Sequence, residues 1–408
     1  MKIRIKKTEA CIFLSLLVSL VFHDYWLFYT IAQILLIVYW GITFSSSIEK
    51  QRYSYNLKKY LPYILFILFG LLSAIWSAVP SYAITMTREL VVIYLMAICL
   101  CVTIQTQKDI QTQLKLLFDV SIVLVIYLII KTPISDWNDI LFGMYSAASD
   151  EGRMGRSIGY HPNAIGTVFF LFTMVSAYWF SVKKSKVYLC SMAIFVVLAA
   201  FTKSRASLLM IIIGLIMFYL VGEKRKWKQV LIILGSVVAV CLVYWAIFNI
   251  PSLYNLFGFR FEGLFGNSGQ QDASTLTRMR FFNYGIELFK DHPILGVGLD
   301  NYKYYSYYYN SSWALTYAHS NWAELLADTG IIGTGLYYVP QIIALVTLWK
   351  NLKLYSGDNR KMLTLFISII LVMIVFDIQK MSYLYFYTIY FSMLGIAVAK
   401  LVKRKMLI

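Results

Sequence analysis

Residues 229–249 read QVLIILGSVVAVCLVYWAIFN, an uncharged and largely apolar stretch that follows the basic segment EKRKWK at residues 223–228. A helix of about 20 apolar residues is long enough to cross the hydrocarbon core of a bilayer. Similar runs recur along the chain, so we expect an all-α polytopic membrane protein with about 12 transmembrane helices. The predicted spans lie near 9–22, 25–43, 61–78, 89–104, 114–130, 160–181, 187–201, 206–221, 229–249, 322–349, 362–376 and 383–400.

Composition and charge support this class of protein. Hydrophobic residues make up 60% of the chain, and the mean hydropathy is +0.67, above the values of soluble domains. Most of the 37 lysines and arginines fall in connections that are cytoplasmic if the N-terminus is cytoplasmic. Both termini are therefore expected in the cytoplasm, in a bacterial cytoplasmic (inner) membrane. The net charge of +17 then reflects topology and contact with anionic lipids, and not a nucleic-acid partner.

The chain is expected to form one membrane domain over residues 1–408. Helices 1–9 occupy 1–249, a large extracytoplasmic loop occupies 250–321, and helices 10–12 occupy 322–408. The first run resembles a signal peptide, but no small-residue cleavage site follows it, so it is interpreted as an uncleaved span. The sequence has no Walker loop, no dinucleotide turn and no metal-ligand spacing, which predicts a protein without a metal or another cofactor.

Two charged side chains near membrane depth are candidates for chemistry, because such residues are costly there. Arg205, in the segment TKSRAS (202–207), lies on the outer side between two spans, and its forked guanidinium suits a phosphate. His319 lies in AHSNWAE (318–324), where Asn321 and Glu324 resemble a capping box. The positive end of the helix would keep His319 neutral, as a general base requires.

Further outer residues complete the candidate site. Arg278 precedes Pro293 and the turn Gly296-Val297-Gly298, and Arg156 precedes Asn163 at the mouth of the sixth span. Three arginines and one base on one side of the membrane fit a diphosphate and a proton to be removed. Glu324 and Asp328 lie far from His319 around a helix, so neither is expected to be its partner. The predicted substrate contacts are Arg156, Asn163, Arg280, Tyr305 and Asn321.

Tyr305 belongs to the aromatic run 302–309, which has two interpretations. Aromatic side chains form belts at membrane surfaces, and their faces also stack on sugar rings.

Three spaced motifs carry a resemblance to a known family. His319-Ser320 is followed after nine residues by Gly330-x-x-Gly333, and Arg205 is followed by Leu209 in an Arg-x-x-x-Leu element. The third motif is an arginine followed by a Pro-x-x-Gly-x-Gly turn, here Arg278 and residues 293–298. Together they resemble the O-antigen ligase and Wzy-type O-antigen polymerase superfamily. The chain departs from it at Phe282, where members often have tryptophan, and at Leu336, where a small residue or tyrosine is expected.

The resemblance implies a fold like that of GT-C-type glycosyltransferases and a metal-independent inverting glycosyl transfer on the outer face of the membrane. The donor would be a glycan linked to undecaprenyl diphosphate, and the acceptor another glycan. His319 would be the catalytic base, Arg205 and Arg278 would stabilise the departing diphosphate, and Arg156 would orient the donor. Membrane lipids, a flippase and a chain-length regulator are the other implied partners.

Several functions fit these features. A composition rich in isoleucine, lysine and tyrosine is typical of low-GC genomes, many of which lack lipopolysaccharide, and it favours a capsule or O-antigen polymerase. The alternative within the family is an O-antigen ligase that transfers glycan to a lipid A core or another surface acceptor. A flippase for lipid-linked oligosaccharides and a binding-only scaffold are alternatives of other classes.

Overall fold

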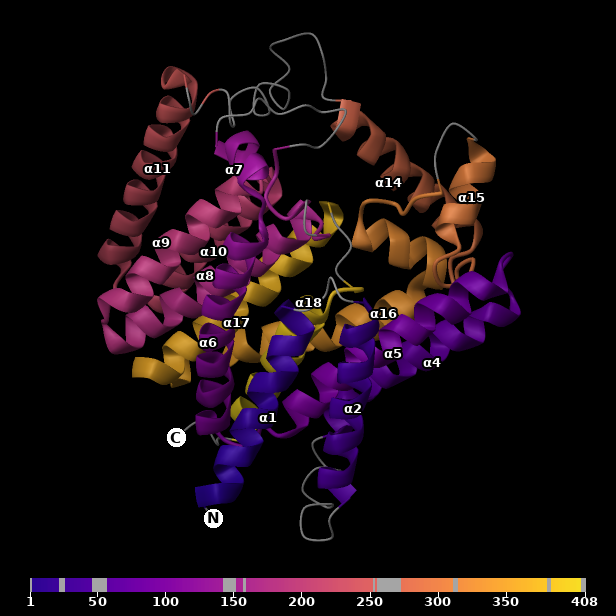
Figure 1. Cartoon of the computed structure of the whole chain (residues 1–408), viewed down its shortest axis with the longest axis horizontal. Coiled ribbons are helices and arrows are strands. Elements are labelled where there is room, and N and C mark those ends of the chain that lie inside the picture. The colour runs from indigo at the N-terminus through magenta and orange to yellow at the C-terminus, as the bar shows by residue number, and fades with distance from the viewer. Residues whose placement is uncertain are drawn as a thin grey trace.

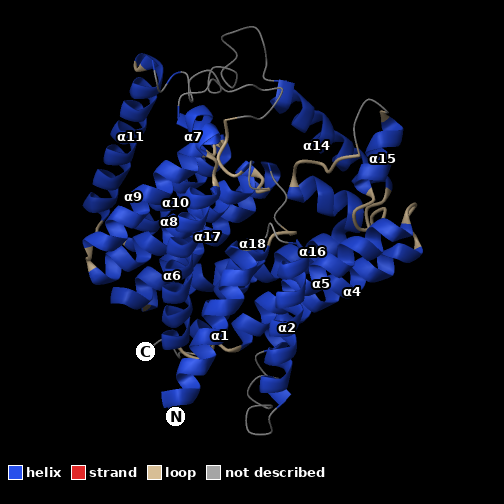
Figure 2. Ribbon diagram, viewed as in Figure 1, coloured by secondary structure: helices blue, strands red, loops and turns tan. Residues whose placement is uncertain are grey.

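The computed structural model describes residues 2–21, 26–45, 57–141, 152–156, 159–251, 254, 273–310, 315–379 and 383–404. Within these ranges every regular element is a helix (Figure 2). The all-α class predicted from the sequence is therefore confirmed.

Each predicted apolar run coincides with one long helix. These helices are α1 (Lys2–Val21), α2 (Trp26–Ser45), α4 (Leu61–Leu72), α5 (Pro80–Val102), α6 (Gln107–Lys131), α8 (Pro162–Lys183), α9 (Lys186–Phe201), α10 (Arg205–Gly222), α11 (Lys226–Asn249), α16 (Asn321–Asn351), α17 (Gly357–Phe376) and α18 (Phe386–Lys403). Within the described ranges, nine helices are long and apolar enough to cross a membrane, and two apolar helices are shorter, Tyr29–Phe44 and α9. The chain is a polytopic helical protein, and the count of twelve spans stays a prediction.

Burial separates a central group of helices from a peripheral one. Almost every side chain of α8 and α18 is buried, whereas α11 has no buried side chain. The faces that α11 exposes carry valine, leucine, isoleucine and tryptophan. Such a helix is unfavourable in water and stable in lipid, where its backbone hydrogen bonds are all internal. The bilayer, and not the protein core, therefore accounts for the apolar sequence of α11.

Three further helices do not coincide with a predicted span: α7 (Ile134–Leu141), α14 (Ala273–Asp291) and α15 (Tyr302–Tyr309). Both chain termini lie at one end of the molecule, and these three helices lie toward the other (Figure 1). The beginnings of α8, α10 and α16 also lie at this second end, because each enters the bundle from it. Short 3-10 turns complete the description: η1 (Lys58–Tyr60), η2 (Ser73–Ile75), η5 (Leu352–Leu354) and η6 (Asp377–Gln379).

Candidate active site

The helix α16 is interrupted at Gly330, where φ is 58° and ψ is −162°. Only glycine enters this region of backbone space readily. The interruption leaves carbonyls without helical partners, and a turn from the preceding loop supplies them. Val297 donates its N–H to the carbonyl of Ala327 at 2.9 Å, and Gly298 donates to that of Asp328 at 2.8 Å. The loop is thereby fixed to the membrane helix by backbone hydrogen bonds.

The same contact continues on the far side of the break. Ile331 donates its N–H to the carbonyl of Pro293 at 2.9 Å. A Cβ on Gly330 would lie 2.3 Å from the carbonyl oxygen of Ile294, and one on Gly296 would lie 2.3 Å from the α16 backbone. The glycines of two separate motifs therefore allow two backbones to pack at a distance that no side chain would permit.

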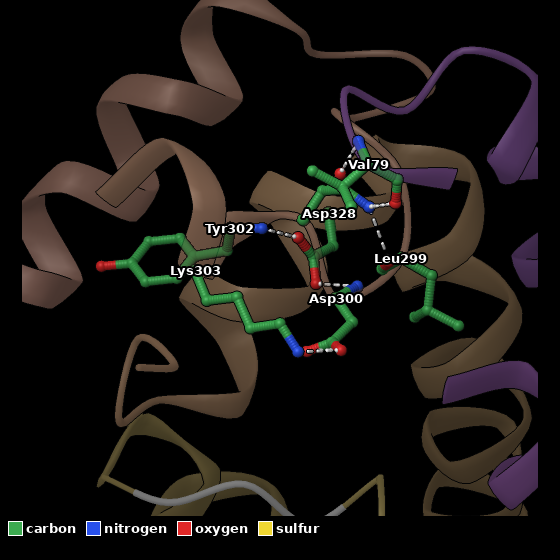
Figure 3. Close-up of polar contacts among 7 residues, drawn as sticks. Val79, Leu299, Asp300, Tyr302, Lys303 and Asp328 are labelled. Atoms are coloured by element: carbon green, nitrogen blue, oxygen red, sulfur yellow. Dashed lines mark hydrogen bonds and ion pairs between the residues drawn. The ribbon is translucent and has the colours of Figure 1, made fainter. Parts of the chain in front are cut away.

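A buried carboxylate extends this junction (Figure 3). Asp328 accepts hydrogen bonds from the N–H groups of Asp300 (2.7 Å) and Tyr302 (2.6 Å). Asn301 accepts from the N–H of Val79 at 2.8 Å, which connects the same turn to the segment before α5. Buried polar groups persist when their hydrogen bonds are made. Asp328 thus holds the beginning of α15 in place, and it is a positioning residue, not a partner of His319.

His319 lies directly before α16 with a φ of 53°, a left-handed conformation. Its ring stacks on Phe281 of α14, with centroids 5.5 Å apart, and contacts the ring of Tyr317 at 4.1 Å. Burial, together with the nearby charges of Arg278 and His161, lowers its pKa from 6.5 to about 4. The imidazole is therefore neutral at pH 7. The sequence predicts this state, but its main cause is burial and not the helix dipole.

The N-terminal cap of α16 differs from the one predicted. Ser320 is the capping residue, and its side chain accepts from the N–H of Ala323 at 3.3 Å. The expected capping box of Asn321 and Glu324 is therefore wrong. Glu324 is fully buried and accepts a hydrogen bond from the N–H of Ala318, one residue before His319. This hydrogen bond fixes the backbone next to His319.

One cavity of about 510 Å³ brings together the three residues predicted to be catalytic. Lys203, Arg205 and Arg278 contribute positive charge to its walls, and His319 lines it as well. Its remaining lining residues are Asn163, Ser204, Ala206, Leu209, Met279, Phe282, Asn283, Ile378 and Gln379. They come from α8, α10, α14, η6 and the loop before α16, so the site forms where the helices meet at the end opposite the termini.

The hairpin between α9 and α10 presents two of the cations. Arg205 is the first residue of α10, and the capping residue Ser204 accepts from the N–H of Ser207 at 3.4 Å. Lys203 has a φ of 49° and is only 2% exposed, and its ammonium group donates to the carbonyl of Asp139 at 3.4 Å. Sequence reasoning missed Lys203, although a lysine in a short connection that is predicted to be outer runs against the usual charge bias.

A second arginine that sequence reasoning missed supports this hairpin from the side. Arg153 is 6% exposed and donates to the carbonyl of Thr202 and to the amide oxygen of Asn163, both at 2.9 Å. The side chain of Asn163 is thereby oriented at the cavity wall. Arg153 is thus a positioning residue for the predicted substrate contact Asn163.

A narrower recess adjoins the cavity and shares Asn163, Arg278, His319 and Gln379 with it. The recess is also lined by His161. Beyond it lies a mainly apolar cavity of about 170 Å³, formed by residues of α1, α2, α5, α8 and α18 together with the segments preceding α8 and α18. The site therefore has polar walls toward the end of the bundle opposite the termini and an apolar extension between membrane helices.

Four residues predicted to contact substrate do not line the cavity. Arg156 and Arg280 are exposed at the surface, and Tyr305 packs against the small apolar cluster formed by α14, α15 and α16. Asn321 is fully buried and donates to the hydroxyl of Tyr338 at 2.7 Å. It also accepts a hydrogen bond from the N–H of Tyr383 at 3.0 Å, which gives it a structural role between α16 and the segment before α18.

Comparison with known proteins agrees with these motifs. Residues 190–338 match the family model described as O-antigen ligase. This range contains Arg205, Arg278, His319 and both glycine motifs. None of the curated proteins compared with the chain matches it. The resemblance to the O-antigen ligase superfamily is therefore confirmed over residues 190–338, in a chain that is a multi-pass membrane protein.

Proposed function

We propose that this protein transfers a glycan from a polyprenyl diphosphate donor to a sugar hydroxyl on the outer face of the membrane, as a polymerase of glycan repeat units. The observation that carries the proposal is the cavity that combines three cations with a neutral histidine. A diphosphate leaving group needs positive charge, and a sugar hydroxyl needs a base. The family match over residues 190–338 supports the same chemistry.

The proposed reaction is a single displacement with inversion. His319 accepts the proton of the acceptor hydroxyl, whose oxygen bonds to the anomeric carbon as the bond from that carbon to the diphosphate breaks. Arg205 and Arg278 stabilise the negative charge that develops on the diphosphate, with Lys203 as a third cation. The apolar cavity between α1, α2 and α8 is a suitable entrance for the prenyl chain, because a lipid donor must reach the site from the bilayer.

Binding of the donor is expected to change the acidity of His319. In the free protein burial and cations hold its pKa at about 4, and a bound diphosphate raises it, because an opposite charge favours the imidazolium. A base is lost as pH falls through its pKa, so kcat/KM should persist to about pH 4 while kcat declines at a higher pH. Initial rates across pH test this. If kcat and kcat/KM declined at the same acidic pH, the expected shift in the pKa of His319 would be contradicted.

Lysine is expected to replace the two arginines poorly. Arg205→Lys and Arg278→Lys keep the charge but lose the fork that meets two phosphate oxygens, which should weaken donor binding and turnover about tenfold or more. Arg280→Lys is the matched control, because Arg280 is exposed and lies about 200° around α14 from Arg278. Donor affinity and single-turnover rate, measured separately, provide the test. Full activity in Arg205→Lys would show that Arg205 contributes only its positive charge and not a forked contact with the diphosphate.

The type of transfer is tested by comparing the surface glycan of a deletion strain with that of its parent. Loss of long chains, with single repeat units still attached at the surface, supports the polymerase. Accumulation of full-length lipid-linked chains identifies a ligase instead. Retention of the lipid-linked units on the cytoplasmic side would overturn the transferase in favour of a flippase.

A further inference from the structure

A second large cavity lies at the opposite end of the bundle, where both termini are found (Figure 1). It is a groove of about 720 Å³ between α4, α16 and α18, and its walls are mostly apolar. The lining of α16 runs from Ile332 to Thr347, which corresponds to about 22 Å along a helix. One leaflet of the hydrocarbon core is about 15 Å deep, so the groove is long enough to hold an acyl chain along its whole depth.

The groove exists because several residues of its lining have small side chains that leave the space between the helices open. A Cβ on Gly335 would find no atom within 4 Å, and Ala344 and Ala399 present only methyl groups. Pro340 lies inside α16, where it has no N–H to donate to the preceding turn. The rims are apolar and exposed, since Val339 is 49% and Ile343 is 52% exposed. The groove therefore presents a hydrophobic surface to the membrane.

Four lysines gather at one end of this apolar surface. Lys58 and Lys59 belong to η1, before α4, and Lys400 and Lys403 belong to the last turn of α18. The two pairs are far apart in sequence, and the fold brings them to one site. Like charges held together repel each other, and a bound anion relieves this repulsion. The apolar walls add a requirement for a hydrocarbon chain, which inorganic phosphate lacks.

We propose that this groove binds an anionic glycerophospholipid of the leaflet on the side of the termini. The lysines bind its phosphate, and one acyl chain lies along α16. Basic pockets between membrane helices suit anionic head groups, and charge complementarity therefore selects this lipid over a zwitterionic one. The site lies on the far side of the Gly330 break from His319, so it is separate from the proposed transfer site.

The test compares lipid retention in nanodiscs that contain phosphatidylglycerol and phosphatidylcholine. The whole protein with Lys58→Gln, Lys59→Gln, Lys400→Gln and Lys403→Gln should retain phosphatidylglycerol at least about tenfold less well by native mass spectrometry. The control removes four charges from the α10–α11 connection and the first turn of α11, none of which lines the groove, through Lys224→Gln, Arg225→Gln, Lys226→Gln and Lys228→Gln. It should retain phosphatidylglycerol like the wild type. An equal loss of phosphatidylglycerol in the control would show that any cluster of basic residues attracts this lipid, and it would overturn the proposal.

A second variant tests the acyl chain independently of charge. Gly335→Phe fills the groove where there is room for a side chain, so it should fold normally and also lose phosphatidylglycerol. Thermal unfolding in phosphatidylcholine alone checks folding. Unchanged retention in Gly335→Phe, or displacement of the lipid by an equal concentration of soluble glycerol phosphate, would show that the site recognises only an anion and would also overturn the proposal.

Discussion

Replacing His319 with asparagine is expected to lower turnover about 100- to 10,000-fold, the usual contribution of a general base. Donor affinity should change little, because the proton moves only as the transition state forms. Asparagine is the informative substitution, since it tolerates the left-handed backbone that His319 adopts at a φ of 53°. It also keeps a polar side chain but accepts no proton near neutral pH. Single-turnover rates with a purified lipid-diphosphate glycan provide the measurement.

The two other histidines in the described residues make this experiment specific. His292 is exposed and does not line the cavity, so His292→Asn should keep the wild-type rate. His161 lines the adjoining recess, and its ring accepts a hydrogen bond from the N–H of Asn163. A large loss of rate in His161→Asn, together with normal turnover in His319→Asn, would transfer the role of base to His161.

Replacing Gly330 with alanine is expected to destabilise the protein by about 3 kcal/mol or more. Backbone strain at this φ and ψ costs about 1–3 kcal/mol for a residue with a side chain. The added Cβ would also lie 2.3 Å from the carbonyl oxygen of Ile294, so the turn at residues 293–298 must move and lose its hydrogen bonds to α16. Hydrogen exchange should increase in peptides covering this turn, and thermal unfolding should occur at a lower temperature.

Gly235 provides the control for that substitution. It lies in α11, where an added Cβ meets no atom within 4 Å, and alanine is the better helix former by about 1 kcal/mol. Gly235→Ala should therefore leave stability unchanged or raise it slightly. Equal behaviour of the two alanine variants would show that the break in α16 is not needed for the junction.

The sequence predicts the helices well because the bilayer imposes a single strong requirement on them. Every predicted apolar run coincides with a helix, including α11, whose apolar surface is exposed. The glycine motifs are also informative in sequence, since Gly296 and Gly330 occupy positions with positive φ where side chains would clash. The co-location of Arg205, Arg278 and His319 in one cavity agrees with the predicted group of charges.

Whether each remaining residue lines the cavity depends on the direction of its side chain, and the spacing of residues in the sequence does not give that direction. Arg278 and Arg280 are equally basic and two residues apart, but only Arg278 lines the cavity. Arg153 precedes Arg156 by three residues in a connection without a regular pattern, and it is the buried one of the two. Asn321 has the right sequence for a cap, but Ser320 takes that place because the helix begins one residue earlier than predicted from the motif.

The break in α16 also bears on how the protein is made. A helix that enters the bilayer with free carbonyls at Ala327 and Asp328 costs several kcal/mol for each group left without a partner. Those partners are N–H groups of residues 297 and 298, which precede α16 in the chain and leave the ribosome first. The first part of α16, up to Gly330, can thus be stable in the bilayer only after the turn at residues 293–298 has packed against it. Folding of this helix is therefore coupled to docking of the loop before it, so a defect in either one would leave the other unassembled.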